Sequence, residues 1–154
     1  MNYLCLEMWK RLYRIAIIPY TILLLYLMLL GVGRAPMDHY VVRLVLVGST
    51  LEFVRQNILW GRWWNLVVNI LGNVFLFVPF GFLGWMNERY KDLGTLLRLF
   101  WSALLLVEAA QYFSRMGVFD VDDFLLNTLG VWLGYVLRGK IDALRCFGRA
   151  PFEK

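Results

Sequence analysis

The sequence predicts an all-α membrane protein of about four transmembrane helices, on the evidence of its composition, its long uncharged runs and its basic residues. Apolar residues make up 60% of the 154-residue chain and charged residues 18%, against roughly 45–50% and about 25% in soluble domains. So few polar side chains cannot cover a domain in water, and we expect a single polytopic domain, 1–154, with lipid as its main solvent and partner. The net charge of +5 comes from scattered Arg and Lys, which fits membrane loops and indicates no nucleic-acid partner.

The first two expected spans are the uncharged runs Ile15–Val32, of 18 residues, and Trp63–Asn87, of 25 residues. The first follows Lys10 and Arg14 and is longer than the ~7–15-residue core of a secretory signal, so we expect an uncleaved anchor. The second corresponds to about 37 Å of helix. Pro79 within it cannot donate a hydrogen bond to the carbonyl four residues back, and we therefore expect its last turns to be kinked or loosened.

The remaining spans are less regular. The third, Leu96–Phe113, carries charged and amide side chains near its ends. The fourth, Phe124–Leu137, has only 14 uncharged residues, and it is long enough to cross only if residues 120–123 enter the outer headgroup layer. Residues 38–60 mix apolar and charged side chains, so we expect an interfacial helix or short strand on the outer surface, with a re-entrant segment as the alternative.

Basic residues give the expected orientation in the cell membrane. Lys and Arg gather before the first run, after the second run, and from Arg138 through the basic tail 141–154. Because such residues favour the cytoplasmic side, we expect a multi-pass protein with both termini in the cytoplasm. Four arginines in the first outer loop weaken this asymmetry, namely Arg34, Arg43, Arg55 and Arg62.

Polar side chains inside the expected spans form three stripes at helical spacing. They are Asn65, Asn69 and Asn73; Glu108, Gln111 and Arg115; and Asp123 and Asn127, followed by Gly130 and Gly134. The second run begins, the third ends and the fourth begins on one side of the membrane, so the stripes should share one half of the bilayer. We predict a shared pocket in which the ionisable groups compensate one another, while hydrogen bonding between helices is an equal alternative for the asparagines. The two glycines favour close helix packing.

The same residues carry a resemblance to a known family over the region 63–139. The motifs are Asn69-x-x-x-Asn73 with Phe77-x-Pro79-x-Gly81, then Glu108-x-x-Gln111, Arg115, Asp120 and Asp123-x-x-x-Asn127-Thr-x-Gly130-x-x-x-Gly134. In this order and spacing they resemble the VanZ-like family. The resemblance implies a small polytopic bacterial membrane protein of a family whose namesake is associated with low-level resistance to the glycopeptide teicoplanin.

We expect a non-enzymatic protein whose outward polar pocket binds a lipid, a cell-wall precursor or a lipophilic glycopeptide and affects antibiotic susceptibility. The candidate pocket residues are Asn69, Asn73, Glu108, Gln111, Arg115, Asp120, Asp123 and Asn127. One alternative is a membrane enzyme acting on a lipid-linked envelope substrate, with Glu108 or an aspartate as acid or base, or with Asp120, Asp122 and Asp123 around a divalent cation. Another is an assembly subunit that docks a second helix on Gly130 and Gly134. The sequence contains no catalytic triad, thiolate–His pair or zinc spacing, so we assign no catalytic residue, metal or cofactor.

Overall fold

The computed structural model describes residues 3–30, 38, 42–43, 48–115 and 119–147, and for Asn65, Asn69 and Asp120 it describes the backbone alone. This part of the chain is helical apart from short connecting turns and one short parallel strand pairing. Its elements are α1 Tyr3–Leu30, β1 Val42–Arg43, α2 Gly48–Leu59, α3 Trp63–Phe77, the 3₁₀ helices η1 Val78–Trp85 and η2 Glu88–Lys91, α4 Leu93–Phe113, β2 Phe119–Asp120 and α5 Val121–Phe147.

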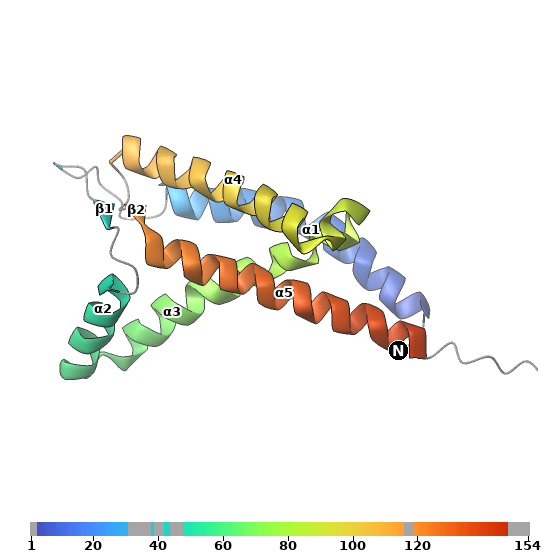
Figure 1. Ribbon diagram of the computed structural model, residues 1–154, viewed down its shortest axis with the longest axis horizontal. Coiled ribbons are helices and arrows are strands. Elements are labelled where there is room, and N and C mark those ends of the chain that lie inside the picture. The colour runs from blue at the N-terminus through green and yellow to red at the C-terminus, as the bar shows by residue number, and fades with distance from the viewer. Residues whose placement is uncertain (1–2, 31–37, 39–41, 44–47, 116–118, 148–154) are drawn as a thin grey trace, which may run out of the picture.

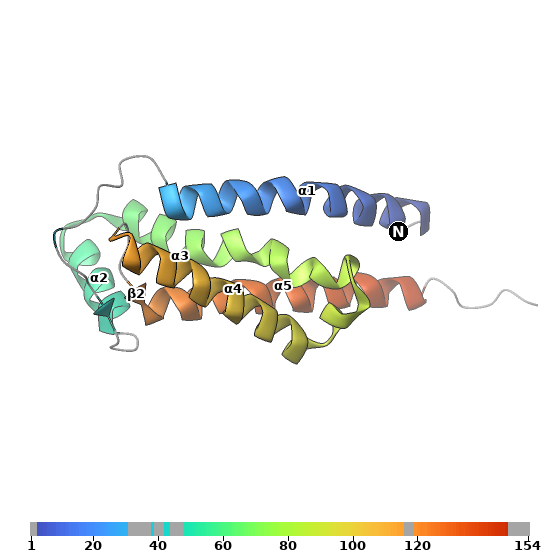
Figure 2. The same ribbon diagram turned by 90° about the horizontal axis from the view of Figure 1, so that it is seen from above.

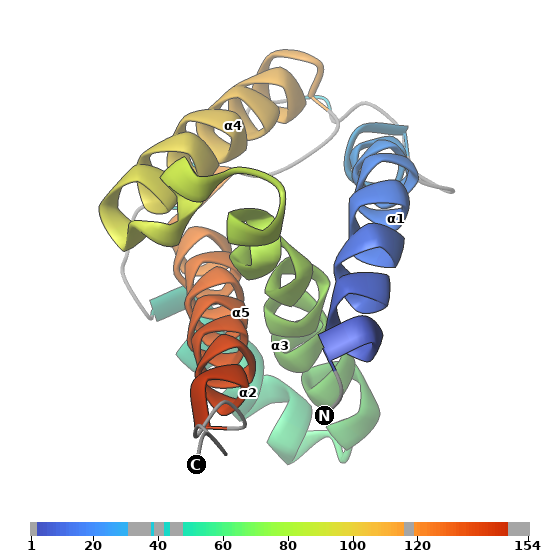
Figure 3. The same cartoon turned by 90° about the vertical axis from the view of Figure 1, so that its right-hand side faces the viewer.

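The long helices run along one axis and give the molecule two distinct ends (Figure 1). The start of α1, the η1–η2 segment and the end of α5 lie together at what we call the η2 end (Figure 2). The α2 helix, the start of α5 and the end of α4 lie at the other end, the α2 end. Viewed along the bundle, η1 occupies the centre, between α1 and α5 and beneath α4 (Figure 3).

Within the described residues, two helices are long and apolar enough to cross a bilayer, Leu6–Leu30 within α1 and the whole of α4. Only 11% of the most apolar window of α1 and 22% of that of α4 is buried inside the molecule. The outward faces carry large apolar side chains such as Ile15, Ile22 and Leu106. A helix in the core of a soluble protein would hide these groups, so their exposure indicates a lipid environment. The predicted helical membrane fold is therefore confirmed in outline, and the count of four spans stays a prediction.

The second expected span divides into two kinds of helix, as Pro79 predicts. The α-helix ends at Phe77 and the chain continues as 3₁₀ helix, with the backbone N–H of Val78 donating to the Phe75 carbonyl three residues back. The apolar part is Ile70–Trp85. Its eight α-helical and eight 3₁₀ residues cover roughly 28 Å, at about 1.5 and 2.0 Å per residue. The tighter helix thus brings a short apolar segment close to the thickness of a bilayer core.

The α1 helix supplies hydrogen bonds to carbonyl groups of the α3–η1 segment. Tyr20 Oη donates to the Leu76 carbonyl at 2.6 Å, and Tyr13 Oη to the Pro79 carbonyl at 2.9 Å. The tyrosines are seven residues apart, on the face of α1 that also buries Leu24. A proline-broken helix leaves backbone groups unsatisfied, and in a lipid environment neighbouring side chains must supply the missing partners. These contacts explain why α1 packs beside η1.

The α5 helix packs on α3 and η1 through glycines. A Cβ at Gly130 would overlap the Val74 carbonyl oxygen, a Cβ at Gly134 would overlap that of Val78, and one at Gly81 would overlap the backbone of α5. The backbones therefore approach as closely as small-residue helix pairs in membranes do. The assembly alternative is wrong in one respect, because this chain's own α3–η1 segment covers both α5 glycines and leaves them no room to dock another helix.

The segment 38–60 contains the helix α2, and the adjacent tryptophans Trp60, Trp63 and Trp64 are exposed. Its interfacial or re-entrant position remains a prediction. The α5 helix is longer than the expected run Phe124–Leu137, since it begins at Val121 and continues to Phe147. Part of the segment expected as a basic tail, 141–147, is thus helical.

Candidate functional site

The polar residues of α3 and α5 meet near the α2 end. Asn73 Nδ2 donates to Asp123 Oδ1 at 2.9 Å, although 50 residues separate them in sequence. Asp123 lies in the first turn of α5, where the helix dipole favours a carboxylate. Both side chains are half-buried. This contact joins two of the three polar stripes.

The α4 helix directs the third stripe into the molecule. Leu96, Phe100 and Leu104 lie on its buried face, and Glu108 and Gln111 continue that face toward the α2 end. The side chain of Glu108 is only 5% exposed. Gln111 Nε2 donates to the Met28 carbonyl at 2.7 Å, which satisfies one of the carbonyls left open at the end of α1.

An indole contact sets the register of α4 against α5. Trp101 Nε1 donates to Thr128 Oγ1 at 3.1 Å. The two helices run in opposite directions, and Glu108 lies two turns beyond Trp101. That displacement carries Glu108 toward the level at which Asp123 begins α5. Glu108 and Asp123 therefore occupy the same end of the bundle.

Asn127 is the most deeply buried of the candidate residues whose side chains the structure describes, with 3% of its surface exposed. Its Oδ1 atom is buried and accepts no hydrogen bond from any residue that the structure describes. Asn127 lies one turn after Asp123 on α5. A buried amide oxygen without a donor is unfavourable by about 1–3 kcal/mol. Asn127 thus holds a buried acceptor that no described donor satisfies. We call Asn73, Glu108, Gln111, Asp123 and Asn127 the polar cluster.

Arg115 follows α4 and is exposed. Its φ of 57° is left-handed, a conformation that usually belongs to glycine at a helix C-terminus. The backbone N–H of Arg115 donates to the Tyr112 carbonyl at 3.0 Å. An arginine at such a position is disfavoured by about 1 kcal/mol or more, so the structure gives no conformational reason for a long cationic side chain there.

Several candidate residues are placed only by their backbone. Asn69 and Asn65 lie one and two turns before Asn73 on α3, which puts them about 6 and 12 Å further along that helix. Asp120 lies in β2, beside the start of α5. Their side chains are outside the described part of the structure. Asp122 is buried in the first turn of α5, and no three His, Cys, Asp or Glu side chains in the described part come together as metal ligands.

The structure also contains polar features that sequence reasoning did not select. Arg138 was expected to be a basic residue beside the tail, yet it is 5% exposed. Arg138 lies four residues after Gly134 and eleven after Asn127, a spacing that puts it on the inward face of α5. This spacing is the sequence feature from which its burial could have been predicted. A small open pocket at the α2–α3 corner is lined by Gln56, Asn57, Trp60 and Arg62.

A helical bundle with apolar outward faces and an internal polar cluster at one end defines an integral membrane protein with buried polar groups between its helices. The sequence model of the VanZ/LLP1 family matches residues 17–139. This is most of the chain, and the chain belongs to that family. The matched region begins within α1, so it extends beyond the motifs of residues 63–139 and includes the second half of the first helix.

One relative is Protein VanZ of Enterococcus faecium, which is 33% identical over 72 residues. The alignment covers 46% of this chain and 44% of that protein, so the chain spans less than half the length of the relative it matches. No solved structure matches this chain.

Proposed function

We propose that this chain is a four-span membrane protein whose polar cluster binds a lipid, a cell-wall precursor or a lipophilic glycopeptide. Binding there alters the susceptibility of the cell to teicoplanin-type antibiotics. The four spans are α1, Ile70–Trp85, α4 and α5. The VanZ-like resemblance and the relationship to Protein VanZ support the proposed antibiotic phenotype, and the geometry of the polar cluster supports the proposed position of the binding site.

The observation that carries the proposal is the hydrogen bond between Asn73 and Asp123, one turn from the buried acceptor of Asn127. Polar and ionisable groups are unfavourable inside a bilayer and mark binding or transport sites by default. Amides alone could serve only to hold helices together. Two carboxylates, Glu108 and Asp123, lie at the same end, and hydrogen bonding between helices does not require such ionisable groups.

The distribution of basic residues supports a polar cluster that faces outward. The η2 end carries most of the Lys and Arg near the proposed spans, including Lys10, Arg14, Lys91 and Arg138. By the positive-inside rule this end, which holds the start of α1 and the end of α5, is cytoplasmic. The polar cluster then opens toward the cell wall, where glycopeptides and wall precursors are found.

Isosteric substitutions test the proposal with little disturbance of packing. Glu108→Gln and Asp123→Asn each remove a charge and retain the shape. Glu88→Gln removes an exposed carboxylate at the η2 end and is the matched control. We expect both cluster variants to lower the teicoplanin inhibitory concentration to that of cells without the protein, while Glu88→Gln leaves it unchanged. Membrane abundance is measured in parallel by immunoblot. Wild-type resistance in both cluster variants would refute the proposed site.

A topology map tests the four-span arrangement separately. Reporters of cytoplasmic or external location are placed after Gly33, Asp92, Arg115 and the last residue. We expect Asp92 and the C-terminus to report the cytoplasm, and Gly33 and Arg115 the exterior. If the positions after Gly33 and Arg115 report opposite compartments, α1 and α4 do not end on the same side and the arrangement is wrong.

A further inference from the structure

A second polar site lies at the η2 end, about 22 Å along α5 from Asp123. The guanidinium of Arg138 packs against Gly84 of η1, where the absence of a Cβ leaves space for Nη1 and Cζ. The side chain of Lys91 also reaches this point, with its Cγ 3.1 Å from the position that a Gly84 Cβ would take. The Tyr135 ring lies 4.8 Å from Arg138 Cζ. Two cationic side chains therefore converge over one glycine.

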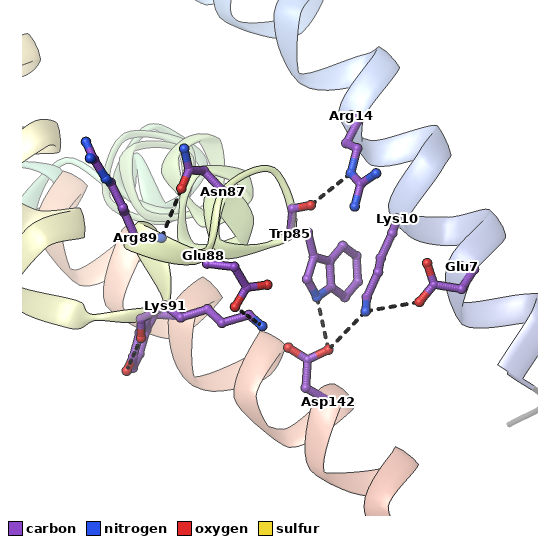
Figure 4. Close-up of polar contacts among 10 residues, drawn as sticks. Glu7, Lys10, Arg14, Trp85, Asn87, Glu88, Arg89, Lys91 and Asp142 are labelled. Atoms are coloured by element: carbon purple, nitrogen blue, oxygen red, sulfur yellow. Dashed lines mark hydrogen bonds and ion pairs between the residues drawn. The ribbon is translucent and has the colours of Figure 1, made fainter.

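The carboxylates near this site contact other cations (Figure 4). Glu88 contacts Lys91 at 2.6 Å, and Asp142 accepts from Trp85 Nε1 at 3.2 Å and lies 3.9 Å from Lys10. Among the described residues, no carboxylate oxygen lies within 4 Å of the Arg138 guanidinium. The Nε and Nη1 atoms of Arg138 are buried and have no acceptor in this part of the chain.

The surroundings are electropositive. The pKa of Glu88 lies below its ordinary value, first because Lys91 donates a hydrogen bond to the carboxylate, and further because of the charges of Lys91, Lys10 and Arg138. Removing a guanidinium from water without a counter-ion is strongly unfavourable. An oxyanion would compensate this charge and accept from the open N–H groups, as phosphate does when it binds arginine.

We propose that Arg138 and Lys91 bind the phosphate group of an anionic phospholipid, in the leaflet beside the start of α1. Arg14 Nε donates to the Trp85 carbonyl at 2.9 Å, one residue after Gly84, and exposed apolar side chains lie on α1 before and after Arg14, among them Leu12, Ile15 and Ile18. A phosphate at Arg138 would therefore lie at the end of the bundle where α1 offers exposed apolar side chains to acyl chains. Basic pockets between helices at a membrane surface recognise anionic headgroups in this way. The exposed fraction of the Lys91 side chain is 47%, so this side chain can reorient from Glu88 toward the headgroup.

The test uses the full chain in nanodiscs of phosphatidylcholine, with a fluorescent phosphatidylglycerol as the probe. Arg138→Gln removes the guanidinium. Arg89→Gln removes an exposed arginine at the same end and is the matched control. We expect Arg138→Gln to weaken probe binding roughly ten-fold or more, because the variant loses a charge-assisted hydrogen bond to the phosphate. Arg89→Gln should leave probe binding unchanged. Equal binding by wild type and Arg138→Gln would overturn the proposal.

Two measurements keep the proposal falsifiable if Arg138→Gln does not fold. Wild-type protein in mixed micelles, analysed by native mass spectrometry, must retain phosphatidylglycerol in preference to phosphatidylcholine. Equal retention of the two lipids would overturn the proposed site. Inorganic phosphate is then added at millimolar concentration. Failure to displace the probe supports a lipid headgroup, while full displacement assigns the site to a soluble phosphate and overturns the lipid assignment.

Discussion

The packing of α5 against η1 yields a prediction whose sign differs between two glycines of one helix. At Gly134 a Cβ would overlap the Val78 carbonyl oxygen and stand 3.1 Å from the Gly81 Cα. These atoms are backbone, so no side chain can rotate away and α5 must separate from η1. At Gly139, five residues later in the same helix, a Cβ would meet no atom within 4 Å.

The expected changes in unfolding free energy follow from this difference. Gly134→Ala forces overpacking and should lower the unfolding free energy by about 1–3 kcal/mol. Gly139→Ala meets no obstacle and should raise it by up to about 0.8–1 kcal/mol, the intrinsic preference of a helix for alanine. The two variants then differ by roughly 2–4 kcal/mol. Both add one methyl group to the same helix, so composition cannot account for the difference.

Unfolding in mixed micelles with increasing SDS, followed by the fluorescence of the seven tryptophans, measures both variants against wild type. Gly72→Ala in α3 is a further control, since a Cβ there also meets nothing within 4 Å. Equal effects of Gly134→Ala and Gly139→Ala would refute the close approach of α5 to η1, and with it the register that aligns Asn73 with Asp123.

Two other positions yield predictions by the same measurement. Arg115→Gly should raise the unfolding free energy by about 1 kcal/mol, because glycine adopts the left-handed backbone conformation without strain. Ser114→Gly is the control and should not raise it, since Ser114 has a φ of −77°. A loss of stability in Arg115→Gly would show that the arginine side chain is needed for folding. The Asp92 carboxylate caps α4 by accepting from Thr95 N–H at 2.7 Å, and hydrogen bonds to the Thr95 side chain and backbone lower its pKa below the ordinary value of 3.8. The depressed pKa means that this stabilisation is present above pH 3.8 and is lost as the pH falls through the folded-state value. Asp92→Ala should therefore be less stable than wild type at pH 7 and converge with it in acid, and a pH-independent difference would contradict the cap.

The α5 helix carries both proposed sites on one inward face. Asp123 and Asn127 lie near its start, and Arg138 lies toward its other end, at the η2 end of the bundle. Between them Gly130 and Gly134 hold the helix against α3 and η1. A substitution at either glycine thus changes the support of both sites, so Gly134→Ala is a poor choice for separating their functions. The isosteric charge changes at Asp123 and Arg138 are the better tools.

The composition and the uncharged runs determined that this is a helical membrane protein, because a helix whose surface residues are apolar is stable in lipid and not in water. The break at Pro79 was also predictable, since it follows from one missing N–H. Such properties depend on residues close together in sequence, and the motifs that place the chain in the VanZ/LLP1 family are of the same local kind.

Only the tertiary structure decided which polar residues meet. Helical spacing put Asn65, Asn69 and Asn73 on one stripe, and the register of α3 against α5 brings Asn73 within hydrogen-bond distance of Asp123. That register depends on the close contact of glycines distant in sequence. The burial of Arg138 likewise requires Gly84, 54 residues earlier. A sequence pattern fixes the face on which a side chain lies, whereas its height against a neighbouring helix is set by packing between residues far apart in the chain.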